Sequence, residues 1–184
     1  MDKSKPLSLF TLFLIFLFAS GGCHGRRDQE SVNADTSSGG KDSTFMFNGR
    51  DLEGWEITQF GPQGPVYVSG ESIVLGMGDG CTGVTWKGDF PEVEYEVTLE
   101  ARRVEGNDFF CGITFPAGDY PCSLILGGWG GTVVGLSSIN GRDASENETT
   151  RLRSFEKDRW YAVRLRFAGG NILAWIDDVP AVDL

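Results

Sequence analysis

Histidine is nearly absent from this chain of 184 residues, which contains only His24. Cysteine is also scarce, and Cys23, Cys81, Cys111 and Cys122 are widely spaced. Structural zinc sites combine cysteine and histidine ligands at short spacings, so we assign no metal ligand. The residues after His24 also offer no imidazole for general acid–base catalysis.

Positive charge is in deficit as well. The chain has 16 Lys and Arg residues against 26 Asp and Glu residues, a formal net charge of −10. A surface of this sign repels phosphate backbones and anionic lipid headgroups. We therefore expect no nucleic-acid partner.

Long apolar runs are limited to one, from Leu7 to Phe18, which is preceded by Lys3 and Lys5 and followed by small residues at 19–22. A helix that crosses the hydrocarbon core needs about 20 apolar residues, and this run has only about 12. Its layout is typical of a signal peptide. We predict that residues 1–22 form an export signal.

A cysteine directly after the small residues makes this signal resemble a bacterial lipoprotein signal, with lipid attachment at Cys23. Ser20 stands where leucine is commonest in that pattern, so cleavage and release without a lipid remains the alternative. Residues 23–44 are polar, with Val32 as their one sizeable apolar residue, and are predicted to be a flexible tether. We expect an exported protein at the cell envelope, with its domain in residues 45–184 held at the membrane.

No stretch shows a sustained 3.6-residue apolar period, whereas short alternating runs separated by turn residues are frequent and glycine numbers 26. In the run from Val93 to Arg102 apolar and polar residues alternate, so the odd-numbered positions should face a core. Further strand-like runs lie at Phe109–Phe115, Ser123–Leu126, Thr132–Ser137, Trp160–Phe167 and Ile172–Ile176.

Many short strands need a second sheet to cover their apolar faces. We therefore predict an all-β fold, an antiparallel β-sandwich of the jelly-roll type. A seven-strand immunoglobulin-type sandwich is the alternative, but the sequence lacks its Cys-Trp-Cys spacing. Cys111 and Cys122 flank an expected turn, so they form either a hairpin disulfide or, with Cys81, a set of three buried thiols.

The segment from Phe45 to Trp55 reads Phe-Met-Phe-Asn-Gly-Arg-Asp-Leu-Glu-Gly-Trp. It resembles the opening signature of the 3-keto-disaccharide hydrolase domain family. Trp86 to Phe90, Asp158 to Tyr161 and Ala174 to Asp178 follow in the order and spacing of that family. The resemblance implies a concanavalin A-like lectin/glucanase jelly roll, an extracytoplasmic location and action on 3-keto-glycosides.

In the chemistry that this resemblance implies, the C3 ketone acidifies the C2 hydrogen and a base removes it. The glycosidic substituent then leaves by elimination, and water can add to the resulting glycal. In the family, carboxylate and histidine residues take part, in some members with a divalent metal as cofactor. A histidine has no matching position after His24, and relatives continue past the point that corresponds to Leu184, so we expect residues 45–184 to be an incomplete domain of this type.

Candidate catalytic residues come from the polar face of the run from Val93 to Arg102. A concave sheet would present Glu100 as a base and Arg102 as an enolate stabiliser, and the alternative is a surface ion pair. Trp129 lies among four glycines, where its indole could stack on a sugar ring. Its alternative is a core tryptophan in a turn that needs a positive φ.

The polar segment 140–151 is the best loop for substrate contacts because it is dense in groups that can hydrogen-bond to hydroxyls. It supplies Glu146 as a further catalytic candidate. It also supplies the candidate substrate ligands Asp143, Asn147, Glu148 and Arg151. The alternative is an ordinary solvated loop.

The remaining tryptophans, Trp55, Trp86, Trp160 and Trp175, are predicted to be core residues. Two functions remain open for the chain. One is a hydrolase or lyase that acts on 3-keto-glycosides at the cell envelope, and the other is a non-catalytic carbohydrate-binding module on the same fold. A carbohydrate is the expected partner in both.

Overall fold

A computed structural model of the chain describes residues 43–184. The predicted signal peptide, the lipid attachment at Cys23 and the tether up to residue 42 lie outside the described residues. Within residues 43–184 no helix is long and apolar enough to cross a membrane. The secondary structure of this part is entirely β.

Twelve strands follow one another along the chain. They are β1 (Trp55–Ile57), β2 (Val66–Ser69), β3 (Ser72–Leu75), β4 (Val84–Trp86), β5 (Tyr95–Arg102), β6 (Cys111–Ala117), β7 (Tyr120–Gly128), β8 (Val133–Ser137), β9 (Arg151–Leu152), β10 (Trp160–Ala168), β11 (Asn171–Ile176) and β12 (Val179–Asp183).

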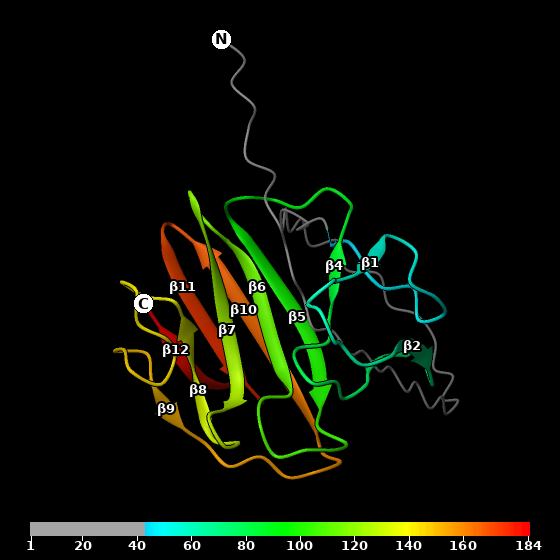
Figure 1. Ribbon diagram of the computed structural model, residues 1–184. Helices are drawn as coiled ribbons and strands as arrows, with labels where there is room; N and C mark the ends of the chain where they lie inside the picture. The colour runs from blue at the N-terminus through cyan, green and yellow to red at the C-terminus, as the bar shows by residue number, and fades with distance from the viewer. Residues whose placement is uncertain (1–42) are drawn as a thin grey trace, which may run out of the picture.

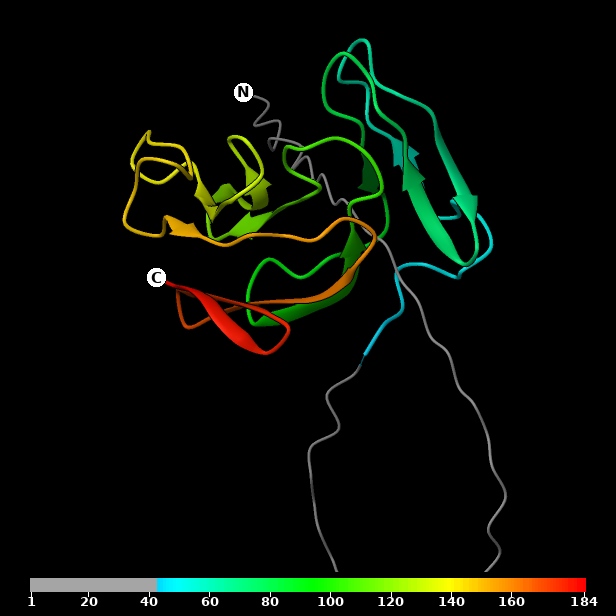
Figure 2. The same ribbon diagram turned by 90° about the horizontal axis from the view of Figure 1, so that it is seen from below.

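Eight of these strands form two four-stranded antiparallel sheets that pack face to face (Figure 1). One sheet has the order β12-β11-β10-β5 and the other the order β6-β7-β8-β9. The pairs β1–β4 and β2–β3 lie beside this sandwich, and the β2–β3 hairpin projects away from it (Figures 1 and 2). The architecture confirms the predicted all-β sandwich of the jelly-roll type, and its twelve strands do not fit the seven-strand alternative.

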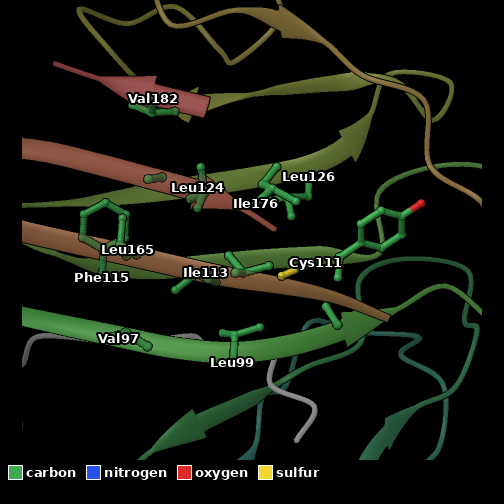
Figure 3. Packing of buried hydrophobic residues seen from close by; sticks show 14 of the residues in the cluster. Val97, Leu99, Cys111, Ile113, Phe115, Leu124, Leu126, Leu165, Ile176 and Val182 are labelled. Carbon is green, nitrogen blue, oxygen red and sulfur yellow. The ribbon is translucent and has the colours of Figure 1, made fainter. Parts of the chain in front are cut away.

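The core lies between the two sheets and is built from the inward-facing positions of each strand (Figure 3). Leu124, Leu136, Leu165 and Ile176 are completely buried. Full burial of a side chain of this size stabilises the fold by about 1.5–3 kcal/mol. The apolar positions of the strands therefore form the interface that holds the two sheets together.

Strand β5 follows the predicted alternation from Tyr95 onward, with Val97, Leu99 and Ala101 in the core. The expectation that Val93 also faces the core is wrong, since this side chain is 60% exposed. The cause lies at Glu94, whose φ of 55° is not that of a strand, so the alternation begins only at Tyr95.

The cysteines are all free thiols in the described part of the chain, so the hairpin disulfide is not formed. Cys111 pairs with Leu126 across the β6–β7 hairpin, whereas Cys122 lies four residues from Leu126 along β7. Four strand residues span about 13 Å, which exceeds the Cα separation of roughly 7 Å that a disulfide tolerates. Cys111 and Cys122 are buried, while Cys81 is only half-buried.

Candidate functional site

A pocket lies on the outer face of the β6–β7 hairpin, on the side away from the core. Its volume is about 190 Å³, and it is lined by Phe60, Cys81, Phe109, Gly112, Thr114, Ser123 and Ile125. Pockets for drug-sized ligands are usually about 300–1,000 Å³. The space therefore suits a single sugar ring rather than an oligosaccharide.

Two rows of cross-strand neighbours form the pocket floor. In one row Thr114 faces Ser123, and their hydroxyl oxygens are 2.8 Å apart in a hydrogen bond. In the other row Gly112 faces Ile125. Because strand side chains alternate between faces, these four positions point outward while Ile113 and Leu124 between them enter the core.

The wall that carries Phe60 and Cys81 continues the β1–β4 pair. The Thr58 amide donates to the Gly83 carbonyl at 3.0 Å, which extends the pairing beyond the last residues of these strands. Phe60 and Cys81 lie close beyond this bond on the two neighbouring segments, and both line the pocket. The wall is thus held by backbone hydrogen bonds to a strand pair.

Phe109 closes one end of the pocket from the β5–β6 loop. Its amide donates to the Asp108 carboxylate at 2.8 Å, and Arg103 donates to the Asp108 carbonyl at 3.2 Å. Arg103 also donates to the Phe155 carbonyl at 2.9 Å. These bonds fix the loop, so Phe109 is held at the Gly112 and Ile125 end of the floor.

The thiols near this hairpin differ in their surroundings. Burial raises the pKa of Cys111 to about 12 and that of Cys122 to about 11. The Cys122 thiol also donates to the Ser137 carbonyl at 3.7 Å. Both thiols face the core, which leaves Cys81 as the one cysteine of residues 43–184 that lines the pocket.

The predicted catalytic residues do not meet at this pocket. Glu100 and Arg102 lie on β5, in the opposite sheet, and alternate with core residues so that they point away from the sandwich. Arg102 lies over the Trp160 ring at 4.6 Å from its centroid. Sheets pack about 10 Å apart, so a single ring bound on β6–β7 does not reach them.

Trp129 lies in the β7–β8 connection with a φ of 47° and is 47% exposed. It is therefore not a core residue, although its turn does need a positive φ. Gly131, two residues later, fits against the Asn107 carbonyl so closely that a Cβ there would lie 2.4 Å from the oxygen. The connection thus packs on the loop that carries Phe109, and a role for Trp129 as a sugar platform stays a prediction.

The candidate ligands of the segment 140–151 mostly bind the segment's own backbone. Asn147 is 9% exposed and donates to the Leu136 and Asp143 carbonyls, both at 2.7 Å. Asp143 accepts from the Ser145 amide at 2.8 Å. Arg151 donates to the Glu148 carbonyl at 3.1 Å.

Glu146 and Glu148 have exposed side chains on this same segment. The segment packs over β8, where a Cβ on Gly135 would lie 3.1 Å from the Ala144 carbonyl oxygen. The structure therefore brings these candidates together as one loop but places none of them among the pocket's lining residues. Their roles toward a substrate stay predictions.

None of the residues that line the pocket is among the site residues predicted from the sequence. Thr114 and Ser123 carried a usable signal, because each is a polar residue inside an apolar run that was predicted to be a strand. Phe60 and Cys81 carried none, since their position depends on the pairing of β1 with β4.

A divalent metal does not fit the described residues. Nowhere in residues 43–184 do three or more His, Cys, Asp or Glu side chains come together in a group that could hold one. We therefore derive no step through a metal.

The segment that resembles the family's opening signature forms a tight structural turn. The Asn48 carboxamide oxygen accepts from the backbone amides of Arg50 and Asp51, and its nitrogen donates to the Asp51 carboxylate at 2.7 Å. The bond from the Asn48 carboxamide nitrogen and one from the Glu53 amide lower the pKa of Asp51. The signature therefore shapes the entry to β1.

The turn leads into Trp55, which packs against Trp86 of β4. Trp55 is buried and donates to the Met46 carbonyl at 2.7 Å, and it meets Trp86 edge to face at 5.1 Å between ring centroids. Trp86 is half-buried against the core. The prediction of core tryptophans is confirmed for Trp55 but is wrong for Trp160 and Trp175, which lie on an outer sheet face where Arg102 and Arg164 cover their rings.

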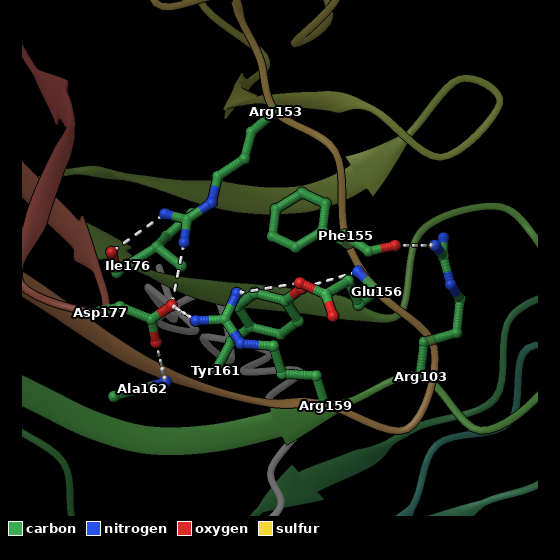
Figure 4. Close-up of polar contacts among 9 residues, drawn as sticks. All are labelled: Arg103, Arg153, Phe155, Glu156, Arg159, Tyr161, Ala162, Ile176 and Asp177. Carbon is green, nitrogen blue, oxygen red and sulfur yellow. Dashed lines mark hydrogen bonds and ion pairs between the residues drawn. The ribbon is translucent and has the colours of Figure 1, made fainter.

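Two other segments that resemble the family, Asp158 to Tyr161 and Ala174 to Asp178, meet in a polar network around Asp177 (Figure 4). One Asp177 carboxylate oxygen accepts from Arg153 and from Arg159, both at 2.9 Å. The other accepts from the Ala162 amide at 3.0 Å. Asp177 has a φ of 52° in the two-residue turn between β11 and β12, so the network fixes that turn to β10.

A comparison with known protein families matches the part of the chain that contains these segments. The family model described as the 3-keto-alpha-glucoside-1,2-lyase-like domain matches residues 42–184, and the chain belongs to that family. This confirms the resemblance to the 3-keto-disaccharide hydrolase domain family. No curated protein and no solved structure matches the chain.

Proposed function

We propose that this member of the 3-keto-alpha-glucoside-1,2-lyase-like family binds one ring of a 3-keto-glycoside in the pocket on β6–β7 and cleaves its glycosidic bond. The observation that carries the proposal is the hydrogen-bonded pair Thr114 and Ser123 on the floor of a ring-sized pocket with aromatic walls. Sugars present hydroxyl edges and apolar ring faces. The lining offers a partner for each.

The hydroxyl pair is well suited to a ligand that both donates and accepts. Thr114 and Ser123 share one of their two protons in the bond between them. The second proton and the remaining lone pairs stay available on the pocket side. A sugar hydroxyl or the C3 ketone can therefore bind without breaking the pair.

Cleavage by elimination requires transfer of the C2 proton to a base; in this pocket the Cys81 side chain, as a thiolate, would have to take this proton and return it to the leaving oxygen. The electron pair left at C2 is first delocalised into the C3 ketone as an enolate, and it then forms the C1–C2 double bond as the C1–O bond breaks. The leaving oxygen takes up a proton. A hydroxyl donor at the ketone oxygen would stabilise the enolate, and the free hydroxyl proton of the Thr114 and Ser123 pair would supply it if the ketone lies over their row.

The second candidate is binding without cleavage. It is favoured by the lining itself, which consists of aromatic, aliphatic, glycine and hydroxyl residues with the Cys81 thiol. Such a set is typical of recognition, in which apolar walls and a few polar groups fix the orientation of a ligand. A location at the cell envelope, with Cys23 lipidated, belongs to both candidates.

Calorimetry and aglycone release with a methyl 3-keto-glucoside test both candidates on the mature chain. We expect binding that weakens about 2- to 10-fold in Thr114→Val and in Ser123→Ala, the range for one lost hydrogen bond. Thr98→Val, which removes an exposed hydroxyl on the opposite sheet, is the matched control. Binding with release supports cleavage, binding without release supports the second candidate, and no binding rejects both.

A further inference from the structure

We infer that Trp129 is a stacking platform for a pyranose ring of a glycan, at a second carbohydrate site outside the pocket on β6–β7. The inference goes beyond the proposed function, because this site needs neither a 3-keto group nor a sugar in the pocket. Trp129 is 47% exposed in the tight connection between β7 and β8, and it is not among the residues that line the pocket.

Trp129 differs from the other four tryptophans of residues 43–184 in the partners of its indole. Two of the others donate their N–H groups to backbone carbonyls and pack edge to face on each other, and two lie beneath arginine guanidinium groups. The first two are Trp55 and Trp86, and the second two are Trp160 and Trp175. The Trp129 indole makes no hydrogen bond, ring contact or cation contact within residues 43–184, so its exposed surface and its N–H group are left for a ligand.

The backbone holds Trp129 in a conformation that a large side chain rarely adopts. Its φ is 47° and that of Gly130 is 86°, and the Gly131 amide closes the turn on the Gly128 carbonyl at 3.2 Å. Turns in which both central residues have a positive φ favour asparagine, aspartate or glycine. A tryptophan in the left-handed region is strained, and strain of this kind is found at ligand-binding sites, where the surrounding structure maintains it.

The surrounding structure fixes this turn at several points. The pairing of β7 with β8 shifts register just before the turn, and such bulges redirect side chains beside functional sites. A Cβ on Gly127 would lie 3.1 Å from the Phe110 ring, and a Cβ on Gly131 would lie 2.4 Å from the Asn107 carbonyl oxygen. The turn is therefore packed against the rest of the domain while its tryptophan stays partly exposed.

The surroundings of the indole favour a sugar over a protein partner. Both neighbours on each side of Trp129 are glycines, so they add no apolar side chains to the larger patch that a protein partner needs. Asn107 and Thr132 are exposed beside the turn, and their carboxamide and hydroxyl groups make no hydrogen bond within residues 43–184. A pyranose ring presents C–H groups to an aromatic face and hydroxyls to such polar groups, and the family of the chain is carbohydrate-related.

Calorimetry of the chain with cellohexaose and with maltohexaose tests the inference. These two glucose oligosaccharides have opposite anomeric linkages and carry no ketone. We expect at least one of them to bind, with an affinity that falls by about fivefold or more in Trp129→Gly and stays within about threefold of the parent value in Trp129→Tyr, which keeps an aromatic ring. Glycine suits the left-handed conformation, so Trp129→Gly removes the ring and keeps the turn. Tyr120→Ala is the matched control, because it removes an exposed aromatic at the other end of β7.

Thr114→Val separates the two sites, since it changes the pocket floor and leaves Trp129 in place. A loss of oligosaccharide affinity in Trp129→Gly, with unchanged affinity in Thr114→Val and Tyr120→Ala and an unchanged thermal midpoint, supports the second site. Weaker binding in Thr114→Val would place the glycan in the pocket and overturn the inference, as would equal affinities in all variants or no binding of either oligosaccharide. The proposed function is tested separately with the methyl 3-keto-glucoside, so either conclusion can fail while the other stands.

Discussion

Replacing Asn147 by alanine separates a structural role from the substrate contact that the sequence predicted for it. Its carboxamide donates to the Leu136 and Asp143 carbonyls and accepts from the amide and the hydroxyl of Thr149, at 2.6–2.9 Å. Thr149 is itself only 3% exposed. Alanine would leave several buried polar groups without partners.

Each buried group left unsatisfied costs about 1–3 kcal/mol, and partial entry of water reduces the total. We therefore expect Asn147→Ala to lower the free energy of unfolding by roughly 2–4 kcal/mol. For a domain of this size the thermal midpoint should fall by roughly 6–12 °C. Thermal unfolding of the chain, followed by circular dichroism, measures this fall in the midpoint.

Glu148→Ala is the matched control, since it removes the neighbouring exposed side chain, and its midpoint should stay within about 2 °C of the parent value. Asn147→Asp keeps the acceptor but loses the two donors, so it should be unstable at neutral pH and recover partly in acid, where the protonated carboxyl can donate. A midpoint for Asn147→Ala equal to that of Glu148→Ala would refute the structural reading. Loss of sugar binding at an unchanged midpoint would instead favour the substrate contact.

Three further predictions concern the stability of the fold. Asp177→Ala should lower the free energy of unfolding by about 1–3 kcal/mol in urea titrations, because it breaks the bonds to Arg153, Arg159 and Ala162, whereas the exposed Asp178→Asn should not. Gly54→Ala should be more damaging than Gly118→Ala in thermal unfolding. Both positions have a positive φ, but only at Gly54 would a Cβ meet the Trp86 ring, at 2.5 Å. Finally, burial raises the pKa values of the Cys111 and Cys122 thiols, so the unfolded chain loses these protons at a lower pH than the folded chain does. The free energy of unfolding should therefore fall as pH rises from about 9 towards 11–12, by up to about 1.4 kcal/mol per pH unit for each thiol. A pH dependence of stability that stays unchanged in Cys122→Ala would contradict this assignment.

Much of the sandwich could be predicted from the sequence because its long strands alternate. The runs around β5, β10 and β11 carry a period of two, and this period reflects one face in the core. The runs around β6, β7 and β8 were predicted from their apolar residues and the turns that bound them. The short strands β1 to β4 and β9 carry too few residues for any period to be read. Val93 was placed wrongly because a single residue, Glu94, leaves the extended conformation just before β5.

The candidate site could not be predicted in the same way. Glu100 and Arg102 share a strand face, as the alternation predicts, but which sheet that face belongs to depends on long-range pairing of β5 with β10. Thr114 and Ser123 become neighbours only when the β6–β7 register is known. Local patterns give the face of each side chain, whereas a pocket depends on which strands are paired.

A sugar bound in the pocket would lie beside Cys81 and shield it, so alkylation of this thiol tests the proposed binding most directly. The rate at which iodoacetamide modifies Cys81 in the folded chain would be measured by peptide mass spectrometry with and without a saturating methyl 3-keto-glucoside. The buried Cys111 and Cys122 report in the same digest on any unfolding. We predict that the sugar slows the modification of Cys81 several-fold while the other two thiols stay unreactive, and an unchanged Cys81 rate at a sugar concentration that saturates binding would contradict the account.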